Sequence, residues 1–117
     1  MIKRFDSTGT FHRAVVHQDR LLLSGLTGGG AQNANMRSQT AAALQRADAL
    51  LQAHGSDKRH VLRASVYVTD MTLKDEMNEA WLEYFGASDL PARATIGVAD
   101  LGPGLLIEIV LEAIVKH

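Results

Sequence analysis

The segment at residues 105–115, LLIEIVLEAIV, constrains the fold more than any other part of this chain. Its odd-numbered positions are all aliphatic, and its even-numbered positions are aliphatic except for two glutamates. Because successive side chains of a strand point to opposite faces, the pattern predicts a strand that is covered on both faces. A single layer of helices on a small domain would cover only one face of its sheet. We therefore expect a symmetric homo-oligomer to bury the other aliphatic face.

The two glutamates of this segment, Glu108 and Glu112, interrupt an otherwise apolar face. An unpaired carboxylate is costly to bury, so each needs an ion-pair partner, a raised pKa or access to water. For Glu112, a structural salt bridge or an exposed strand end explains the residue as well as a function does. For Glu108 the functional explanation is favoured.

The rest of the chain alternates between strand and helix patterns. Short apolar runs around a polar turn predict paired strands, and apolar residues at spacings of three and four predict helices. Gly55 and Gly86 are expected to end the two helices, and Thr72 with Asp75 resembles a capping box. Strands are expected at residues 14–17, 21–23, 61–69, 92–98 and 105–115, and helices at 33–54 and from about 72 to 86. This order predicts an α+β fold in which two helices pack on one face of a mixed sheet.

Length and composition limit the classes of protein to consider. The 117 residues predict one domain spanning 1–117, and a net charge of −1 gives no general attraction for nucleic acid or anionic membrane. No apolar run is long enough for a bilayer, and the N-terminus turns polar too early for a signal peptide. Without cysteines there is no disulfide framework or thiolate chemistry. We expect a cytoplasmic protein.

Arg93, which follows Pro91 and Ala92 at a strand start, is a candidate partner for Glu108. If the last two strands pair antiparallel around a turn near Leu101, Arg93 falls about opposite Glu108. A guanidinium there could hold a carboxylate through two parallel hydrogen bonds. From the residues alone, a structural Arg–Glu pair and a functional one are equal alternatives.

Other patterns point to less chemistry. The five histidines show no metal-ligand spacing, and the glycines at 28–30 lack the Lys-Ser/Thr of a phosphate-binding loop. Ser24 has no neighbouring His–Asp arrangement for a catalytic triad. Met77, Trp81 and Phe85 follow each other at helical spacing, and we expect them in the core.

Three short motifs resemble the RidA family, also called the YjgF/YER057c/UK114 family. Leu23-Ser24-Gly25 ends a strand, Pro91-Ala92-Arg93 opens the next-to-last strand, and Ile107-Glu108-Ile109 lies in the last. The order of elements is similar along nearly the whole chain. The segment at 66–70 and the Met77-Asn78 pair also resemble the family pattern.

The resemblance implies a chorismate-mutase-like fold assembled as a homotrimer, with three clefts between subunits. Active members of the family hydrolyse reactive enamines and imines, such as 2-aminoacrylate and 2-iminopropanoate, to 2-oxo acids and ammonia. They need no metal or organic cofactor. Carried over by position, Arg93 would bind the substrate carboxylate and Glu108 would orient or deprotonate the attacking water. Ser24 and the Gly25 backbone would line the cleft, and Asn78 would support it. The implied partners are a small carboxylate and further copies of the chain, with no nucleic acid and no membrane.

The sequence also departs from the family pattern. Phe11 stands where imine deaminases of the family carry a tyrosine, although a gap would bring His12 there instead. Thr95 replaces a common cysteine, and the glycines at 28–30 replace a proline-containing segment. We expect Phe11, His12 and Thr95 to line the substrate site. Two alternatives therefore stay open: a non-catalytic binder of small carboxylates on the same trimer, and a protein- or RNA-directed role.

Overall fold

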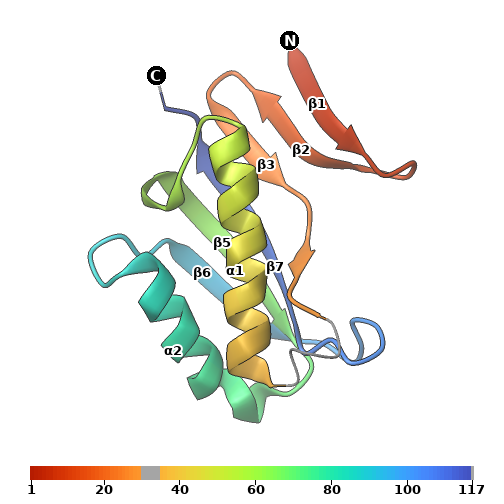
Figure 1. Cartoon of the computed structure of the whole chain (residues 1–117), viewed down its shortest axis with the longest axis vertical. Coiled ribbons are helices and arrows are strands. Elements are labelled where there is room, and N and C mark those ends of the chain that lie inside the picture. Colours follow the sequence, from red (N-terminus) through yellow and green to blue (C-terminus); the bar gives the residue numbers. More distant parts are fainter. Residues whose placement is uncertain (30–34, 117) are drawn as a thin grey trace.

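The computed structural model of the chain describes residues 1–29 and 35–116. These residues form a mixed seven-stranded sheet and two α-helices (Figure 1). The strands are β1 (Ile2–Ser7), β2 (His12–His17), β3 (Arg20–Leu23), β4 (Leu26–Thr27), β5 (Val61–Val68), β6 (Ala92–Gly97) and β7 (Ile107–Ile114). The helices are α1 (Met36–Ala53) and α2 (Lys74–Phe85), with short 3₁₀ turns at Lys58–His60 and Met71–Leu73.

The predicted strand β7 lies in the middle of the sheet. The strand order is β1-β2-β3-β7-β5-β6, and the short strand β4 pairs with β7 beyond the end of β3. All pairs are antiparallel except β5 with β6. The parallel pair follows from its connection, because α2 carries the chain back across the sheet between these two strands.

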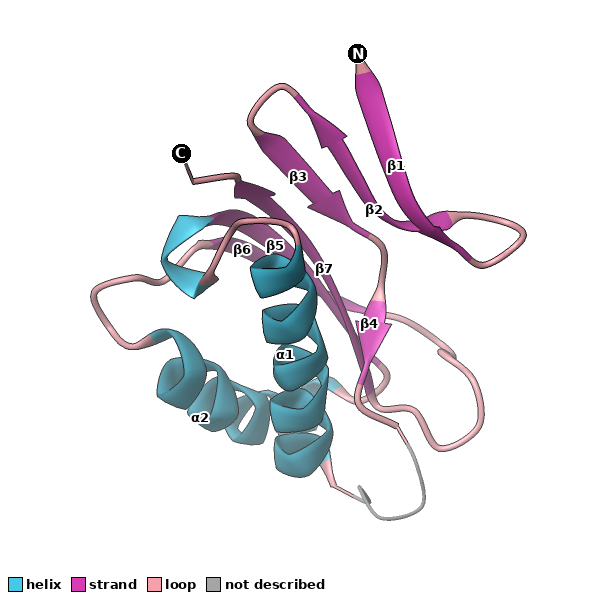
Figure 2. Cartoon of the chain, turned by 45° about the horizontal axis from the view of Figure 1, so that its top comes forward, coloured by secondary structure: helices cyan, strands magenta, loops and turns pink. Residues whose placement is uncertain are grey.

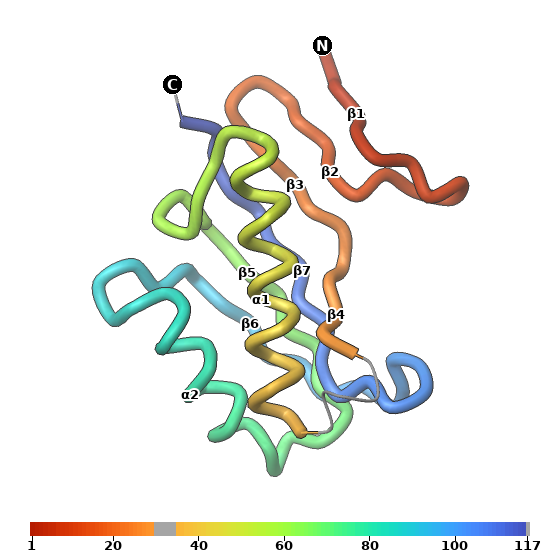
Figure 3. Tube along the Cα trace, viewed as in Figure 1, coloured from red at the N-terminus to blue at the C-terminus, as the bar shows by residue number. Residues whose placement is uncertain are grey.

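The predicted hairpin of the last two strands is wrong. Strands β6 and β7 do not pair, because β5 lies between them and bonds to both. Figure 3 shows the chain leaving β6 and entering β7 after a loop. Residues 98–106 are long enough to pass the end of β5, so neighbours in sequence are not neighbours in the sheet.

Both helices pack on one face of the sheet, as predicted (Figure 2). Under them lie the odd-numbered side chains of β7, with Ile107, Ile109 and Ala113 fully buried. The predicted core residues Met77 and Phe85 of α2 are also buried, as is Trp81. The helix-covered face therefore carries the hydrophobic core.

The opposite face of β7 is apolar but only partly covered within the described residues. Its even-numbered residues from 108 to 114 are all half-buried. Leu22 on β3 and Ile96 on β6 remain 41% and 39% exposed. We call this surface the open face of the sheet. Its burial in an oligomer stays a prediction.

The chain differs from the predicted elements mainly at its ends and turns. Strand β1 was not predicted, because its polar sequence carries little signal. It pairs with β2, and its Phe5 packs against the core and the His54 ring. The two-residue strand β4 was also missed. The predicted helix at 33–54 begins at Met36, after Asn35 accepts a hydrogen bond from the Ser38 N–H. Residues 33 and 34, like Gly30 of the glycine run, lie outside the described residues.

The caps of the two helices were predicted unevenly. Gly55 and Gly86, beyond the C-terminal ends of α1 and α2, both have a φ of 76°, as expected for glycines at helix ends. The capping box at Thr72 is wrong, because the Thr72 N–H and hydroxyl both donate to Asp70. Helix α2 begins only at Lys74, and no side chain caps it.

Candidate functional site

The two residues at the centre of the predicted site lie on opposite faces of the sheet. Across β5, Arg93 is the register partner of Ala64, and Glu108 is the partner of Tyr67. Positions three apart on a strand point to opposite faces, so Arg93 lies under the helices and Glu108 on the open face. The predicted pairing of these two side chains within one chain is therefore wrong, since it depended on the hairpin.

The first group of predicted residues gathers around Glu108, and we call Ser24, Gly25 and Glu108 the glutamate half-site. Strand β4 brings them together, because its Thr27 is the register partner of Glu108. A Cβ atom on Gly25 would meet Oε2 of Glu108 and would lie 2.7 Å from its Cδ. Only glycine lets the backbone approach this carboxylate so closely.

Glu108 differs from Glu112 in having no partner. Its carboxylate forms no hydrogen bond or ion pair with any residue in the described part of the chain. Glu112, four residues along on the same face, pairs with Arg20 and lies 3.8 Å from Nη2 of Arg63. The structural explanation therefore holds for Glu112, whereas Glu108 is left free to act on a ligand or water.

Ser24 contributes a buried hydroxyl. Its N–H donates to the carbonyl of Arg13 at 2.9 Å, which joins the end of β3 to β2. Its Oγ is buried without a hydrogen-bond partner among the described residues. Such an orphaned group costs about 1–3 kcal/mol, so its retention beside Gly25 favours a role toward a ligand or water.

Phe11 and His12 lie at the start of β2, just before the residue that bonds Ser24. Phe11 is 52% exposed, and its carbonyl accepts a hydrogen bond from the Thr8 N–H at 2.8 Å. His12 is the first residue of β2 and is half-buried. Both residues thus lie one strand away from Ser24. By strand alternation, however, His12 shares the face of the buried Ala14, which is the face opposite Glu108.

A buried glutamine that was not predicted holds the entry to β7. The Nε2 of Gln39 donates to the Gly104 carbonyl at 2.8 Å, and its Oε1 accepts from the Leu106 N–H at 2.8 Å. Gln39 is 1% exposed and lies on the buried face of α1. A polar residue in an apolar helix stripe was the available sequence signal.

The second group of predicted residues gathers around Arg93, between β6 and α2. Arg93 and Asn78 line a cavity of about 290 Å³ together with four apolar side chains. We call these six residues the arginine half-site: Asn78, Trp81, Leu82, Leu90, Pro91 and Arg93. Thr95 lies on the same strand, as the register partner of Val66, and does not line this cavity.

The guanidinium of Arg93 is held by neutral groups. It lies 5.2 Å from the centre of the Trp81 ring, and its Nη1 lies 3.6 Å from Sδ of Met77. No carboxylate of the described residues pairs with it. Partial burial lowers the pKa of Arg93. An arginine nevertheless stays charged at neutral pH, so Arg93 presents a partly desolvated positive charge to the cavity.

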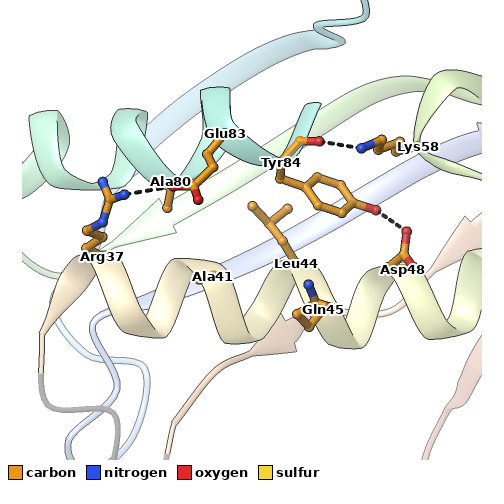
Figure 4. Close-up of a pocket in the computed structure, with 9 residues that line it drawn as sticks. All are labelled: Arg37, Ala41, Leu44, Gln45, Asp48, Lys58, Ala80, Glu83 and Tyr84. Atoms are coloured by element: carbon orange, nitrogen blue, oxygen red, sulfur yellow. Dashed lines mark hydrogen bonds and ion pairs between the residues drawn. The ribbon is translucent and has the colours of Figure 1, made fainter. Parts of the chain in front are cut away.

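A further groove runs between the two helices on the outside of the protein (Figure 4). It contains none of the predicted site residues, and its charged side chains have partners within the protein. Arg37 pairs with Glu83 and Glu79, and Asp48 accepts a hydrogen bond from the Tyr84 hydroxyl at 2.7 Å. Burial, with Asp48 beside it, raises the pKa of Tyr84. This groove therefore contributes to helix packing.

Neither a metal centre nor a membrane segment emerges from the described residues. No cluster of three or more His, Asp or Glu side chains that could hold a metal ion is found in residues 1–29 and 35–116. Neither α1 nor α2 is long and apolar enough to cross a bilayer.

The comparisons with known proteins agree with the sequence motifs. The model of the family described as endoribonuclease L-PSP matches residues 1–115. A RutC family protein of Haemophilus ducreyi is 30% identical over 117 residues, covering 100% of this chain and 99% of that protein. The RutC family protein YoaB of Escherichia coli is 30% identical over 97% of this chain and 98% of its own length.

Solved structures show the same fold. A YjgF family member from Neisseria meningitidis superposes with a TM-score of 0.93 at 32% identity, covering 100% of this chain and 97% of that one. A YjgF/YER057c/UK114 family member from Mycobacterium tuberculosis superposes with a TM-score of 0.87 at 30% identity, covering 98% and 100%. The chain therefore belongs to the endoribonuclease L-PSP family, the group also known as the YjgF, RutC or RidA family.

Proposed function

We propose that this protein is an enamine and imine deaminase whose active site is completed between two copies of the chain. The observation that carries the proposal is the separation of two complementary half-sites. Glu108 and Arg93 both lack an ion-pair partner among the described residues, yet they lie on opposite faces of one sheet. A site that uses both needs Glu108 from one copy and Arg93 from another.

The residue types suit hydrolysis of a 2-imino acid. Arg93 would hold the substrate carboxylate through two parallel hydrogen bonds. Glu108 would accept a proton from a water molecule as the water oxygen attacks the imine carbon. That proton passes to the nitrogen, and the new hydroxyl group then gives its own proton to the nitrogen as the C=O bond forms and the C–N bond breaks. The products are the 2-oxo acid and ammonia. An enamine substrate would first tautomerise to the imine.

The glutamate half-site would supply the remaining polar contact. The orphaned Oγ of Ser24 lies next to Gly25, whose backbone approaches the Glu108 carboxylate. A carboxylate in that position also neutralises the positive charge of a protonated imine. Phe11 offers no hydroxyl, so in this proposal proton transfer depends on Glu108.

A homotrimer is the assembly we propose. The open face carries half-buried aliphatic side chains along β7 and exposed Leu22 and Ile96 beside it. These side chains form a continuous apolar patch and are not scattered single residues. Association of subunits would remove this patch from water. A closed ring would also place each glutamate half-site against a neighbouring copy.

The direct test is hydrolysis of 2-iminopropanoate generated by an amino-acid oxidase, with semicarbazide trapping the imine that remains. We expect the wild-type protein to accelerate imine loss and the Arg93→Ala variant to lose this activity while its oligomeric state is unchanged. Full activity in the variant would rule out the assigned role of Arg93.

Subunit complementation tests the composite site separately. Arg93→Ala and Glu108→Gln chains, each inactive, are co-expressed with different tags and the mixed oligomer is purified. In a trimeric ring that contains both kinds of chain, one of the three sites combines an intact Glu108 with an intact Arg93 from the neighbour, so about a third of the sites should be active. The control is an oligomer that mixes Arg93→Ala chains with chains carrying both Arg93→Ala and Glu108→Gln. It contains no intact Arg93, and its activity is the background. No recovery above that background would refute a site shared between copies.

A second candidate, a non-catalytic receptor for small carboxylates, is favoured by one observation. The arginine half-site has its charge and its cavity within one chain, whereas Phe11 lacks the hydroxyl expected of imine deaminases. Calorimetric binding of a 2-oxo acid without any imine hydrolysis would support this candidate. The family name also raises RNA cleavage, and failure of RNA to bind at low salt would remove that role.

A further inference from the structure

The cavity beside Arg93 is unusually apolar for a site that binds a small anion. Its lining includes Trp81, Leu82, Leu90 and Pro91, and its polar side chains are Arg93 and Asn78. Leu82 and Leu90 are 51% and 47% exposed, although both are large aliphatic residues. They lie on different elements, one on α2 and one in the segment that leads into β6. Two exposed leucines that meet at one cavity indicate an apolar ligand group.

The positive charge of Arg93 lies in the same cavity as its apolar wall, by which we mean Trp81, Leu82, Leu90 and Pro91. Trp81 lies under the guanidinium at 5.2 Å and also lines the cavity, so the cation and the apolar surface are in contact. Nη1 of Arg93 donates to the Sδ of Met77, so other N–H groups of Arg93 remain available to a carboxylate. A ligand held there thus meets an apolar surface immediately beside its anionic group.

The chemistry of 2-imino and 2-oxo acids then restricts the ligand. In these compounds the carboxylate and the side chain are attached to the same carbon, so a carboxylate on Arg93 keeps the side chain within a few bonds of the guanidinium. A methyl group would leave most of the cavity of about 290 Å³ unfilled. A branched aliphatic or aromatic side chain would cover Leu82, Leu90 and Trp81.

We propose that the arginine half-site selects 2-imino acids with a bulky apolar side chain, branched aliphatic or aromatic, over 2-iminopropanoate. The proposal rests on the deaminase function for its substrate class, and on the arginine half-site alone for its preference. Each methylene group placed in an apolar pocket improves discrimination by roughly tenfold or more. The preference for a leucine-derived ligand over an alanine-derived one is therefore expected to reach at least about tenfold.

The first measurement is binding of the stable 2-oxo acids, which does not require turnover. Calorimetry with pyruvate, 4-methyl-2-oxopentanoate and phenylpyruvate gives three dissociation constants for the wild-type oligomer. We expect both bulky acids to bind at least about tenfold more tightly than pyruvate. Equal binding, tighter binding of pyruvate, or no binding of any of the three would overturn the proposal.

Variants of the apolar wall locate the preference. Leu90→Ala and Leu82→Ala remove exposed side chains, so the fold should tolerate both, and we expect each to reduce the preference by roughly three- to tenfold. Leu62→Ala makes the same change at a residue that is also 47% exposed but lies outside the cavity, and should leave the preference unchanged. A preference that survives both cavity variants, or falls equally in Leu62→Ala, would contradict the proposal.

Turnover separates this inference from the deaminase proposal. The imines of alanine, leucine and phenylalanine, generated by amino-acid oxidase, are compared by kcat/KM. If no imine is hydrolysed while the binding preference persists, the deaminase function fails and the selectivity stands. If imines are hydrolysed with 2-iminopropanoate as the best substrate, the deaminase function stands and the selectivity is refuted.

Discussion

The glutamate half-site and the arginine half-site are built in different ways. The first is a close approach of backbone and carboxylate, in which β4 brings Gly25 against Glu108 on the open face of the sheet. The second is a side-chain cavity between an edge strand and a helix, with Arg93 lying over Trp81. The glutamate half-site leaves no space for an added side-chain atom at Gly25, whereas the arginine half-site is open and lined by exposed leucines.

In the proposed mechanism the two regions have different tasks. Proton transfer requires a carboxylate at a fixed position, which the tight packing around Glu108 provides. Ligand selection requires a surface of suitable charge and shape, which the cavity around Arg93 provides. Substitutions in the glutamate half-site should therefore reduce kcat, and substitutions in the arginine half-site should change the KM and the choice of ligand.

The largest effect is expected from Glu108→Gln. The amide keeps the size of the side chain but cannot accept a proton from water, so we expect kcat for imine hydrolysis to fall by roughly 10²- to 10⁴-fold. Binding of 2-oxo acids should change little, as measured by calorimetry. Glu112→Gln, on the same face of the same strand, is the matched control and should keep its activity. Equal losses in the two variants would abolish the distinction between a free and a paired glutamate.

Arg93→Lys is expected to have the next largest effect. Lysine keeps the charge but lacks the planar fork of the guanidinium, so a two-pronged carboxylate bond is lost. We expect the dissociation constant of a 2-oxo acid and the KM of the imine to rise by roughly ten- to thirtyfold, with a smaller change in kcat. If only kcat falls in this variant, Arg93 acts in the chemical step, and the assignment of ligand binding to the arginine half-site is contradicted.

Gly25→Ala probes the tight packing of the glutamate half-site. The added methyl group would meet the Glu108 carboxylate, so we expect the side chain to shift and kcat to fall by on the order of tenfold. Gly97→Ala is the control, because its Cβ would lie 3.5 Å from Cε of Met71, an ordinary contact. If kcat falls equally in both variants, the loss does not come from Glu108.

The smallest effect concerns an acid outside both half-sites. A hydrogen bond from His60, with Lys116 and the Arg59 N–H also contributing, lowers the pKa of Asp57 to about 2. A lowered pKa adds stability above the unfolded value of 3.8 and loses it as pH falls toward 2.

Asp57→Asn should therefore cost about 1 kcal/mol at pH 5, after allowance for solvent screening, and less as the pH falls from 4 to 2. Urea unfolding at several pH values measures this difference. A cost that does not depend on pH would mean that the charge of Asp57 contributes nothing.

Individual strands and helices could be predicted from the sequence because each depends on the local periodicity of apolar residues. The alternation at 105–115 predicted a strand with two apolar faces, and β7 lies in the centre of the sheet with its odd-numbered side chains buried. The spacing of apolar residues predicted α1 and the burial of Met77 and Phe85. The Pro-Ala-Arg motif and the following glutamate indicated the family that the comparisons identify.

The relation between Arg93 and Glu108 was decided only by the tertiary structure. Strand order depends on which strands pair after α2 has crossed the sheet, and no local pattern records that β5 lies between β6 and β7. The same holds for β4, whose two residues owe their conformation to β7. The sequence by itself thus determined which residues are the candidates for the chemistry and which faces are apolar. Non-local pairing separated the two charged groups, because the face on which a side chain lies is set by register with strands distant in the chain.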